Sequence, residues 1–206
     1  CSLGNYRFGQ VEAKAHSTAQ RWELSKLDAR YKRHQLNVQG FWQDDGNAGF
    51  SEFTGQLQSP NIGTMLNEFQ LTSAIAGSTA DIKFTLNWPG APNQYAVADL
   101  SGNVSYTLGE GSLTEVSDQG SRLFSIFSLD SLVRKLRLDF RDVFAKGFFY
   151  NKMSGNLAIA KGVAQTSDAS IDGVPGNLQI QGYADLVSKQ LDYQMAFSPK
   201  VTSSLP

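Results

Sequence analysis

The sequence has very little of the residue types that build catalytic or metal sites. It contains one cysteine, Cys1, and two histidines, His16 and His34. A single cysteine excludes an internal disulfide, and the two histidines have no partner at the spacing of a zinc site. We therefore expect no metal ion and no other cofactor. Whether Cys1 carries a modification stays open at this level.

Charge is also scarce. Asp, Glu, Lys and Arg make up 18% of the chain, and the formal net charge is −1. Nucleic-acid-binding domains carry a basic patch or stripe that this balance does not provide, so no nucleic acid is expected. The chain lacks an apolar run of the roughly 18 residues that span a bilayer. It also lacks a phosphate-binding loop, a serine-hydrolase elbow and a zinc-protease motif, so we do not expect an enzyme.

What the sequence does have is alternation of apolar and polar residues. Over residues 80–88 every second residue is apolar, until Pro89 ends the pattern, which is typical of a half-buried strand. Similar alternation returns along the rest of the chain, at 104–108, 157–159, 178–186 and 191–197, and more weakly at 6–8, 11–15, 22–24, 27–31 and 36–38. Nineteen glycines suit many strands joined by tight turns. We predict a mainly β protein built as an antiparallel meander.

Gly-Asn pairs recur ahead of these strands. Gly102, Gly155 and Gly176 each stand before an Asn and an apolar residue. Because Gly and Asn tolerate positive φ, each pair predicts a hairpin turn. The acidic run that begins at Asp44 is also interpreted as a turn, because it lacks the ligand spacing and the closing Glu of a calcium loop.

Two segments interrupt the β pattern. Residues 61–69 follow Pro60 with apolar residues at helical spacing, which predicts a short helix. Residues 121–146 combine a wide apolar stripe with a basic side, which predicts a longer helical insertion. That basic side is either the solvated face of an amphipathic helix or a contact for anionic phospholipid headgroups.

Two architectures fit this much apolar alternation. A closed β domain buries its apolar face against another sheet or against itself, and would serve as a structural or interaction module. An open curved sheet leaves a long apolar trough, which in water is a site for lipid or for a partner. The residues alone leave both architectures open.

Longer motifs give the chain a family resemblance. They are Leu-Asn-Trp-Pro-Gly-Ala-Pro at 86–92, Leu-Gly-Glu-Gly-Ser-Leu-Thr-Glu-Val at 108–116, and the stretches 121–140 and 142–149. In this order they resemble the C-terminal region of the YhdP branch of the AsmA-like superfamily. The resemblance covers nearly the whole chain, and its motifs are most specific from Ala80 to Pro199.

The resemblance implies that residues 1–206 form a single segment of a larger protein, with β strands folded like a taco around an open apolar groove. Members are anchored in the inner membrane of Gram-negative bacteria and cross the periplasm as bridge-like lipid transfer proteins. They are thought to carry phospholipid between the inner and outer membranes, and this segment would lie near the outer membrane. The implied partners are phospholipid, the remainder of the longer chain, and outer-membrane or other envelope proteins. The alternative is a closed β module that supports outer-membrane assembly or integrity.

Alternation and resemblance together predict the residues of a lipid site. Thirteen apolar residues are expected to line the groove: Ile82, Phe84, Leu86, Val104, Tyr106, Leu108, Leu157, Ile159, Leu178, Ile180, Tyr193, Met195 and Phe197. Residues of the helical insertion are expected to gate the end of the groove or to face a membrane: Leu123, Phe124, Phe127, Leu132, Arg134, Lys135 and Arg137. No catalytic residue is predicted.

Overall fold

The structure, a computed structural model, describes residues 9–47, 49–69, 71, 74–114 and 148–200, and the backbone of two short strands ahead of them. Its strands are β1 (Ser2–Leu3), β2 (Tyr6–Arg7), β3 (Gln10–Ser17), β4 (Arg21–Tyr31), β5 (His34–Gln43), β6 (Phe50–Ser59), β7 (Ile75–Gly77), β8 (Ala80–Pro89), β9 (Ser101–Leu108), β10 (Gly111–Leu113), β11 (Phe148–Ala160), β12 (Val163–Gly173), β13 (Gly176–Asp185) and β14 (Gln190–Pro199). Its helices are α1 (Ile62–Glu68) and the 3₁₀ turns η1 (Pro92–Gln94) and η2 (Val97–Asp99).

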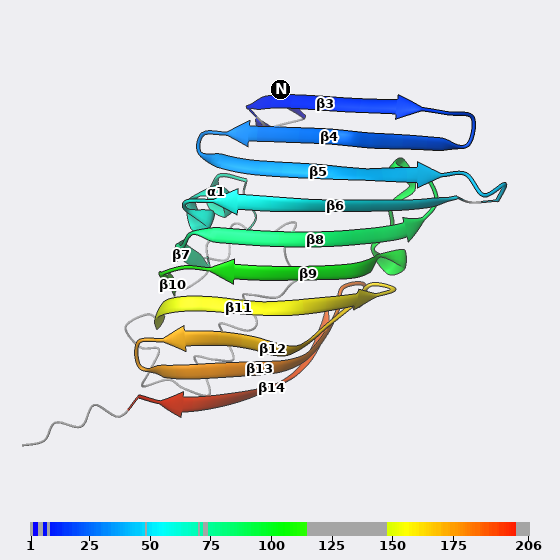
Figure 1. Cartoon of the computed structure of the whole chain (residues 1–206). Coiled ribbons are helices and arrows are strands. Elements are labelled where there is room, and N and C mark those ends of the chain that lie inside the picture. Colours follow the sequence, from blue (N-terminus) through cyan, green and yellow to red (C-terminus); the bar gives the residue numbers. More distant parts are fainter. Residues whose placement is uncertain are drawn as a thin grey trace, which may run out of the picture.

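One large antiparallel sheet dominates the molecule. Its main path runs β3-β4-β5-β6-β8-β9-β11-β12-β13-β14, and the short β10 joins it by pairing with both β11 and β7 (Figure 1). Strands β1 and β2 form a separate pair. Because β3 and β14 are the two edges of the path, the sheet stays open in the described part of the chain. The predicted antiparallel meander is confirmed.

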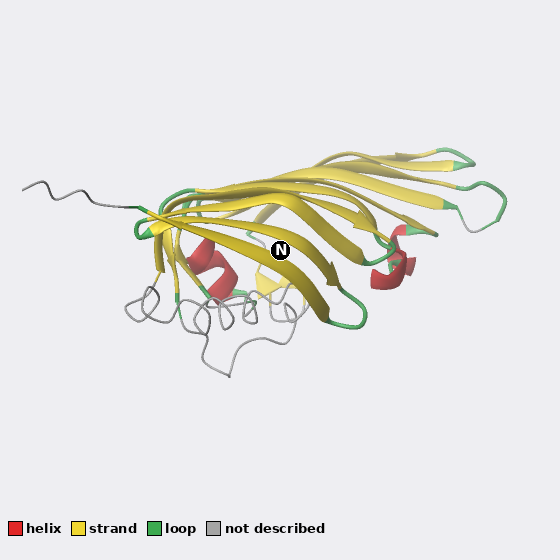
Figure 2. Ribbon diagram, turned by 90° about the horizontal axis from the view of Figure 1, so that it is seen from below, coloured by secondary structure: helices red, strands yellow, loops and turns green. Residues whose placement is uncertain are grey.

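The two faces of the sheet differ in chemistry. Along β14, half-buried residues such as Leu191, Tyr193 and Met195 alternate with exposed polar ones, as period-two patterning requires. We call the face that carries Phe84 the apolar face, and the face that carries the adjacent Thr85 the polar face. The sheet arches, and α1 and the 3₁₀ turns lie beneath the arch (Figure 2). Both helical pieces contribute to clusters on the apolar face.

The first cluster forms where α1, β7 and β10 cover one end of the apolar face. Its largest fully buried side chains are Tyr150, Phe148, Ile62 and Leu178. The hydroxyl of Tyr150 lies 2.6 Å from the Ser78 hydroxyl, so its polar atom is satisfied inside the cluster. Burial of this apolar surface fixes the short helix and the β7–β10 pair on the sheet.

The second cluster lies at the opposite ends of the strands. Trp88, Leu100, Ile159, Ala164 and Leu186 are its buried members. Val97 of η2 packs against it, so the β8–β9 connection covers this end of the apolar face. Among the described residues, the two clusters therefore cover the face at both ends of its central strands.

The short helix predicted at 61–69 is confirmed as α1. Asn61 begins it, and its side-chain oxygen accepts a hydrogen bond from the Thr64 amide at 2.9 Å. The turns predicted at two of the Gly-Asn pairs are wrong, because Gly155 and Asn156 lie in the middle of β11 and Gly102 and Asn103 lie within β9. The helical insertion predicted at 121–146 lies outside the described residues.

Candidate functional site

Strand register brings the predicted lipid-lining residues together. Phe84 pairs with Val104, and Val104 pairs with Leu157. Residues directly opposite each other in an antiparallel pair project from the same face. The pairings across β8, β9, β11, β12, β13 and β14 place all thirteen predicted residues on the apolar face, including Ile180 opposite Met195 and Leu178 opposite Phe197.

These residues differ in how far they are covered. Ten of them belong to the two packed clusters or pack against them: Leu108, Leu178, Ile82, Tyr106, Ile180, Met195, Phe197, Ile159, Leu86 and Val104. The other three, Phe84, Leu157 and Tyr193, lie in neither cluster and are half-buried. Among the described residues, Phe84 and Leu157 are therefore the predicted lining residues least involved in the two clusters, whereas the buried members of the clusters stabilise the fold.

The apolar face continues over the first strands of the sheet. Gly55 of β6 pairs with Phe84, Val38 of β5 pairs with Gly55, and Leu27 of β4 pairs with Val38. The site prediction omitted these positions, although the same alternation marks them in the sequence. The apolar face thus crosses every strand from β4 to β14 on the main path.

Aromatic rings lie over glycines along this face. A Cβ added at Gly55 would stand 2.4 Å from Cζ of Phe84, and one added at Gly155 would stand 2.8 Å from the Tyr106 hydroxyl. The ring therefore occupies the space that a side chain would need. This close approach explains why a glycine stands within β11, where the sequence had suggested a turn.

Tyr106 is a predicted lining residue whose phenol has a raised pKa. Burial, together with a smaller effect of the nearby Asp168 carboxylate, which disfavours a second negative charge, raises the pKa of Tyr106 to about 12. The phenol therefore stays neutral at physiological pH. Its environment is apolar, as expected for a residue that packs against the first cluster.

A trough of about 970 Å³ crosses the sheet on the other side. Many of its lining side chains lie in two cross-strand rows on the polar face, which places the trough on that face. These residues are Lys26, Asp28, Asn37, Gln39, Thr54, Gln56, Lys83, Thr85, Asn103, Ser105, Asn156 and Gln165. Several satisfy one another, such as Thr54 with Thr85 at 3.0 Å and Lys26 with Asp28 at 2.9 Å. The predicted residues Phe84, Val104 and Leu157 also contribute to its lining. Because polar side chains fill these two rows, an acyl chain finds fewer apolar side chains here than on the apolar face.

Each of the two histidines contacts a polar side chain on a neighbouring strand. His34 is buried, and its Nδ1 lies 2.8 Å from the Ser59 hydroxyl. Burial lowers the pKa of His34, because the charged ring loses its hydration there. His16 is exposed on β3, with Nε2 at 3.6 Å from a Glu23 carboxylate oxygen.

The described residues were predicted to hold neither a metal ion nor a membrane-spanning helix. Among them, no group of three or more His, Cys, Asp or Glu side chains could hold a metal ion. No helix in the same ranges is both long and apolar enough to cross a membrane. The predicted gate residues between Leu123 and Arg137 lie outside the described ranges, so their role stays a prediction.

Comparison with known proteins gives a consistent result. A family model described as YhdP protein matches residues 1–206. The chain is similar to the Intermembrane phospholipid transporter YhdP of Escherichia coli (strain K12), with 27% identity over 208 aligned residues. That alignment covers 100% of this chain but only 16% of the relative, so the chain spans about a sixth of the relative's length. No solved structure matches the chain.

Proposed function

Because the chain belongs to the YhdP family, we propose that it is a segment of a protein that transports phospholipid, and that the apolar face is the surface along which the acyl chains lie. The observation that carries this proposal is the register. It aligns apolar side chains on one face of an open sheet across successive strands. The name of the E. coli relative supplies the ligand class.

The physical chemistry of the face fits acyl chains. Each CH₂ group that leaves water gains about 0.8 kcal/mol. Neighbouring strands lie about 4.8 Å apart, so the side chains within a cross-strand row repeat at short, even intervals across the sheet. A chain on such a surface meets many similar contacts and few polar ones, which allows it to move without falling into one deep site.

The finer parts of the proposal extend beyond this chain. We propose that the segment acts within a longer protein that bridges the inner and outer membranes through the periplasm, with this segment near the outer membrane. The relative's much greater length supports a longer protein, and its description as an intermembrane transporter supports a bridge between the two membranes. Outer-membrane or other envelope proteins are the proposed protein partners.

A closed β module was the alternative. In that architecture, every strand pairs on both sides or the apolar face packs against a second sheet. In the described part of the chain, β3 and β14 are the edges of the sheet, and Phe84 and Leu157 lie in neither packed cluster. These observations favour the lipid-carrying face over the closed module.

Lipid extraction and mass spectrometry on the purified chain test the proposal. Leu157→Gln introduces an amide on the apolar face, whereas Ala158→Gln introduces the same side chain at the next residue, on the polar face. We expect co-purifying phospholipid to fall in the first variant and to match the unmodified chain in the second. Equal lipid in both variants, with both folded by circular dichroism, would contradict the proposal.

A further inference from the structure

All three tryptophans of the chain lie in one cross-strand row. Trp22 pairs with Trp42, Trp42 pairs with Ser51, and Ser51 pairs with Trp88. The row is on the apolar face, near the ends of β4, β5 and β8. Resting on the proposed function, we infer that this tryptophan row, Trp22-Trp42-Trp88, binds the glycerol-ester region of phospholipid and so fixes which end of the lipid lies at this margin.

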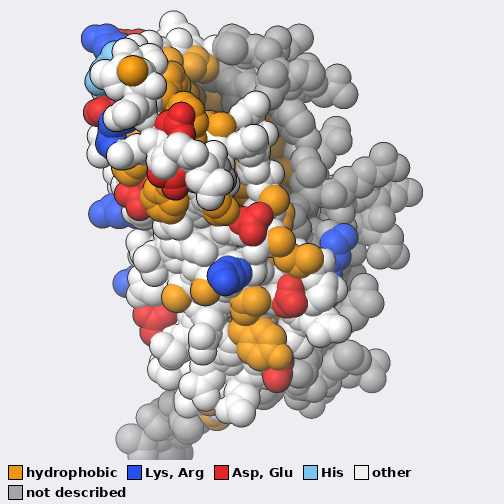
Figure 3. Space-filling model, turned by 90° about the vertical axis from the view of Figure 1, so that its right-hand side faces the viewer, with side chains coloured by type: hydrophobic (Ala, Val, Ile, Leu, Met, Phe, Trp, Pro, Cys, Tyr) orange, Lys and Arg blue, Asp and Glu red, His pale blue; other side chains and the backbone are white. Residues whose placement is uncertain are grey.

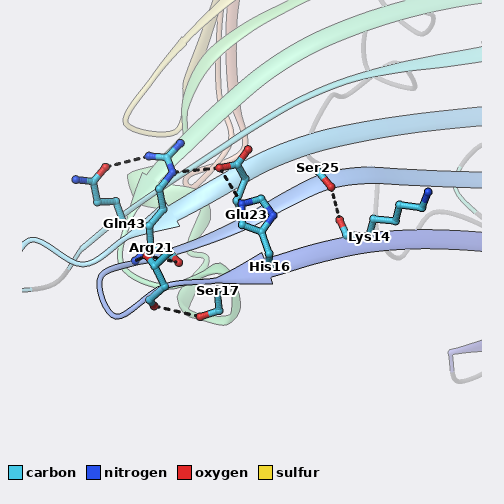
Figure 4. A network of polar contacts seen from close by, with 8 residues as sticks. Lys14, His16, Ser17, Arg21, Glu23, Ser25 and Gln43 are labelled. Atoms are coloured by element: carbon cyan, nitrogen blue, oxygen red, sulfur yellow. Dashed lines mark hydrogen bonds and ion pairs between the residues drawn. The ribbon is translucent and has the colours of Figure 1, made fainter.

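The row stands at a boundary between apolar and polar surface. Inward from it along β4 and β5 lie Leu24 and Val38 on the same face. Outward lie the strand ends and their turns, where the Asp44 carboxylate accepts from the Gly46 amide at 2.9 Å. On the polar face of the same strand ends, Arg21 donates to Gln43 at 3.0 Å and pairs with Glu23 at 3.5 Å (Figure 4). Tryptophan favours such boundaries because its ring is apolar while its N–H seeks a polar partner.

The same end of the molecule is mixed in surface character. Figure 3 views this end, where hydrophobic side chains emerge among acidic and basic ones. Trp22 and Trp42 are half-buried, and Tyr95, whose ring meets that of Trp88 edge-on, is 52% exposed. The rings of Phe53 and Trp88 stack with centroids 5.4 Å apart, which supports the row from within. Ring surface therefore remains available to a ligand at this margin.

One indole in the row has an unused donor. Nε1 of Trp88 donates to the carbonyl oxygen of Ala91 at 3.2 Å. Nε1 of Trp42 is buried and makes no hydrogen bond in the structure. A buried N–H without a partner costs about 1–3 kcal/mol. Gly49 lies against this N–H, since a Cβ added there would stand 2.5 Å from Nε1, so an acceptor that reaches Nε1 by displacing Gly49 would be favoured. Ester carbonyl oxygens of a phospholipid are acceptors of the required kind.

The opposite margin of the face offers no such boundary. There α1 and its neighbours form the first packed cluster, and Lys32 pairs with Glu68 to hold the β4–β5 turn against the helix. Tyr31 meets Phe69 edge-on at the same place. At the tryptophan margin the second cluster covers Trp88 on the central strands, whereas Trp22 and Trp42 on β4 and β5 lie outside that cluster. A lipid beside β4 and β5 therefore has one favoured direction: acyl chains inward, ester region at the row.

Intrinsic fluorescence gives a direct test, because every tryptophan of the chain belongs to the row. The purified chain is loaded with phospholipids that carry bromine either near the carboxyl end or near the methyl end of the acyl chain. We expect a larger loss of tryptophan fluorescence with bromine near the carboxyl end. The double variant Trp22→Phe/Trp42→Phe, which leaves only the buried Trp88 as reporter, should lose most of this difference.

Lipid retention, measured on the same samples by extraction, distinguishes a failure of the proposed function from a failure of the inference about the tryptophan row. If no lipid stays with the chain, the proposed function fails. If lipid stays but bromine near the methyl end quenches equally or more, the proposed function stands and the inference is overturned. A Trp42→Phe variant keeps the ring and removes the N–H donor. It should retain less lipid than the unmodified chain, and unchanged retention would refute the role of Nε1.

Discussion

Single residues on the apolar face are constrained by what lies directly across from them. Gly55 faces Phe84 so closely that an added Cβ would also stand 2.7 Å from the Asn37 carbonyl oxygen. The ring can turn aside, but the backbone oxygen can yield only if the strand shifts. Glycine at this position is therefore a packing requirement of the sheet.

Gly55→Ala tests this requirement. We expect a loss of about 1–3 kcal/mol in the free energy of unfolding, because the methyl group overpacks the contact. Urea denaturation measures it. In Gly55→Ala/Phe84→Leu the smaller side chain leaves room, so the added cost of Gly55→Ala should be smaller there than in the unmodified chain. An unchanged midpoint for Gly55→Ala alone would show that Phe84 does not lie over Gly55.

His34 predicts a pH dependence of stability. Burial lowers its pKa in the folded state, so the unfolded chain takes up a proton first as the pH falls through about 6.5. The contribution of the neutral ring is thus complete above that pH and declines below it. Carboxyl groups with a lowered pKa, such as Glu68, change the free energy of unfolding only at lower pH, below about 4.5.

The measurement is the free energy of unfolding at about pH 7.5 and about pH 5.5. The difference between the two should shrink in His34→Gln. His16→Gln, at an exposed position on β3, is the matched control and should keep the difference of the unmodified chain. Equal differences in all three proteins would contradict the account of His34.

At the scale of elements, α1 depends on its cap and on its packing. A helix of 7 residues is too short to be stable alone, so Ile62 and Met65 in the first cluster supply most of its stability. The Asn61 side chain satisfies one amide that the helix start leaves free. Since α1 covers one end of the apolar face, its loss would expose that end.

Asn61→Ala removes the cap. We expect the free energy of unfolding to fall by about 1 kcal/mol, measured by urea denaturation. Asn61→Asp keeps a side-chain oxygen that accepts from the Thr64 amide, and it should stay near the unmodified value. If both variants lose the same amount, the effect does not come from the cap.

Elements were predictable where a local pattern decides them. The strand over 80–88 shows period-two alternation, and the structure has β8 over Ala80–Pro89. Residues 61–69 carry both a preceding proline and helical spacing, and α1 follows them closely. Gly155 was misread as a turn residue because the reason for its glycine is Tyr106 on another strand, which no local pattern contains.

At the scale of the whole molecule, the sequence predicted which residues share the apolar face, but it did not predict which of them other elements cover. Alternation alone assigns Ile82, Phe84 and Leu86 to one face, and register confirms it. Which of them are covered depends on α1 and η2, whose positions follow from long-range packing. The trough on the polar face was not predicted from the sequence. Its lining residues come from strands between β4 and β12, and only the folded sheet brings these strands together.

The most direct test of the lipid-carrying face is photo-crosslinking at two adjacent residues on opposite faces. A photoreactive amino acid replaces Phe84 on the apolar face in one protein and Thr85 on the polar face in another. After illumination with phospholipid present, mass spectrometry should find a lipid adduct at position 84 and little or none at position 85. Adducts at position 85 alone, or equally at both positions, would contradict the assignment of the apolar face as the lipid surface.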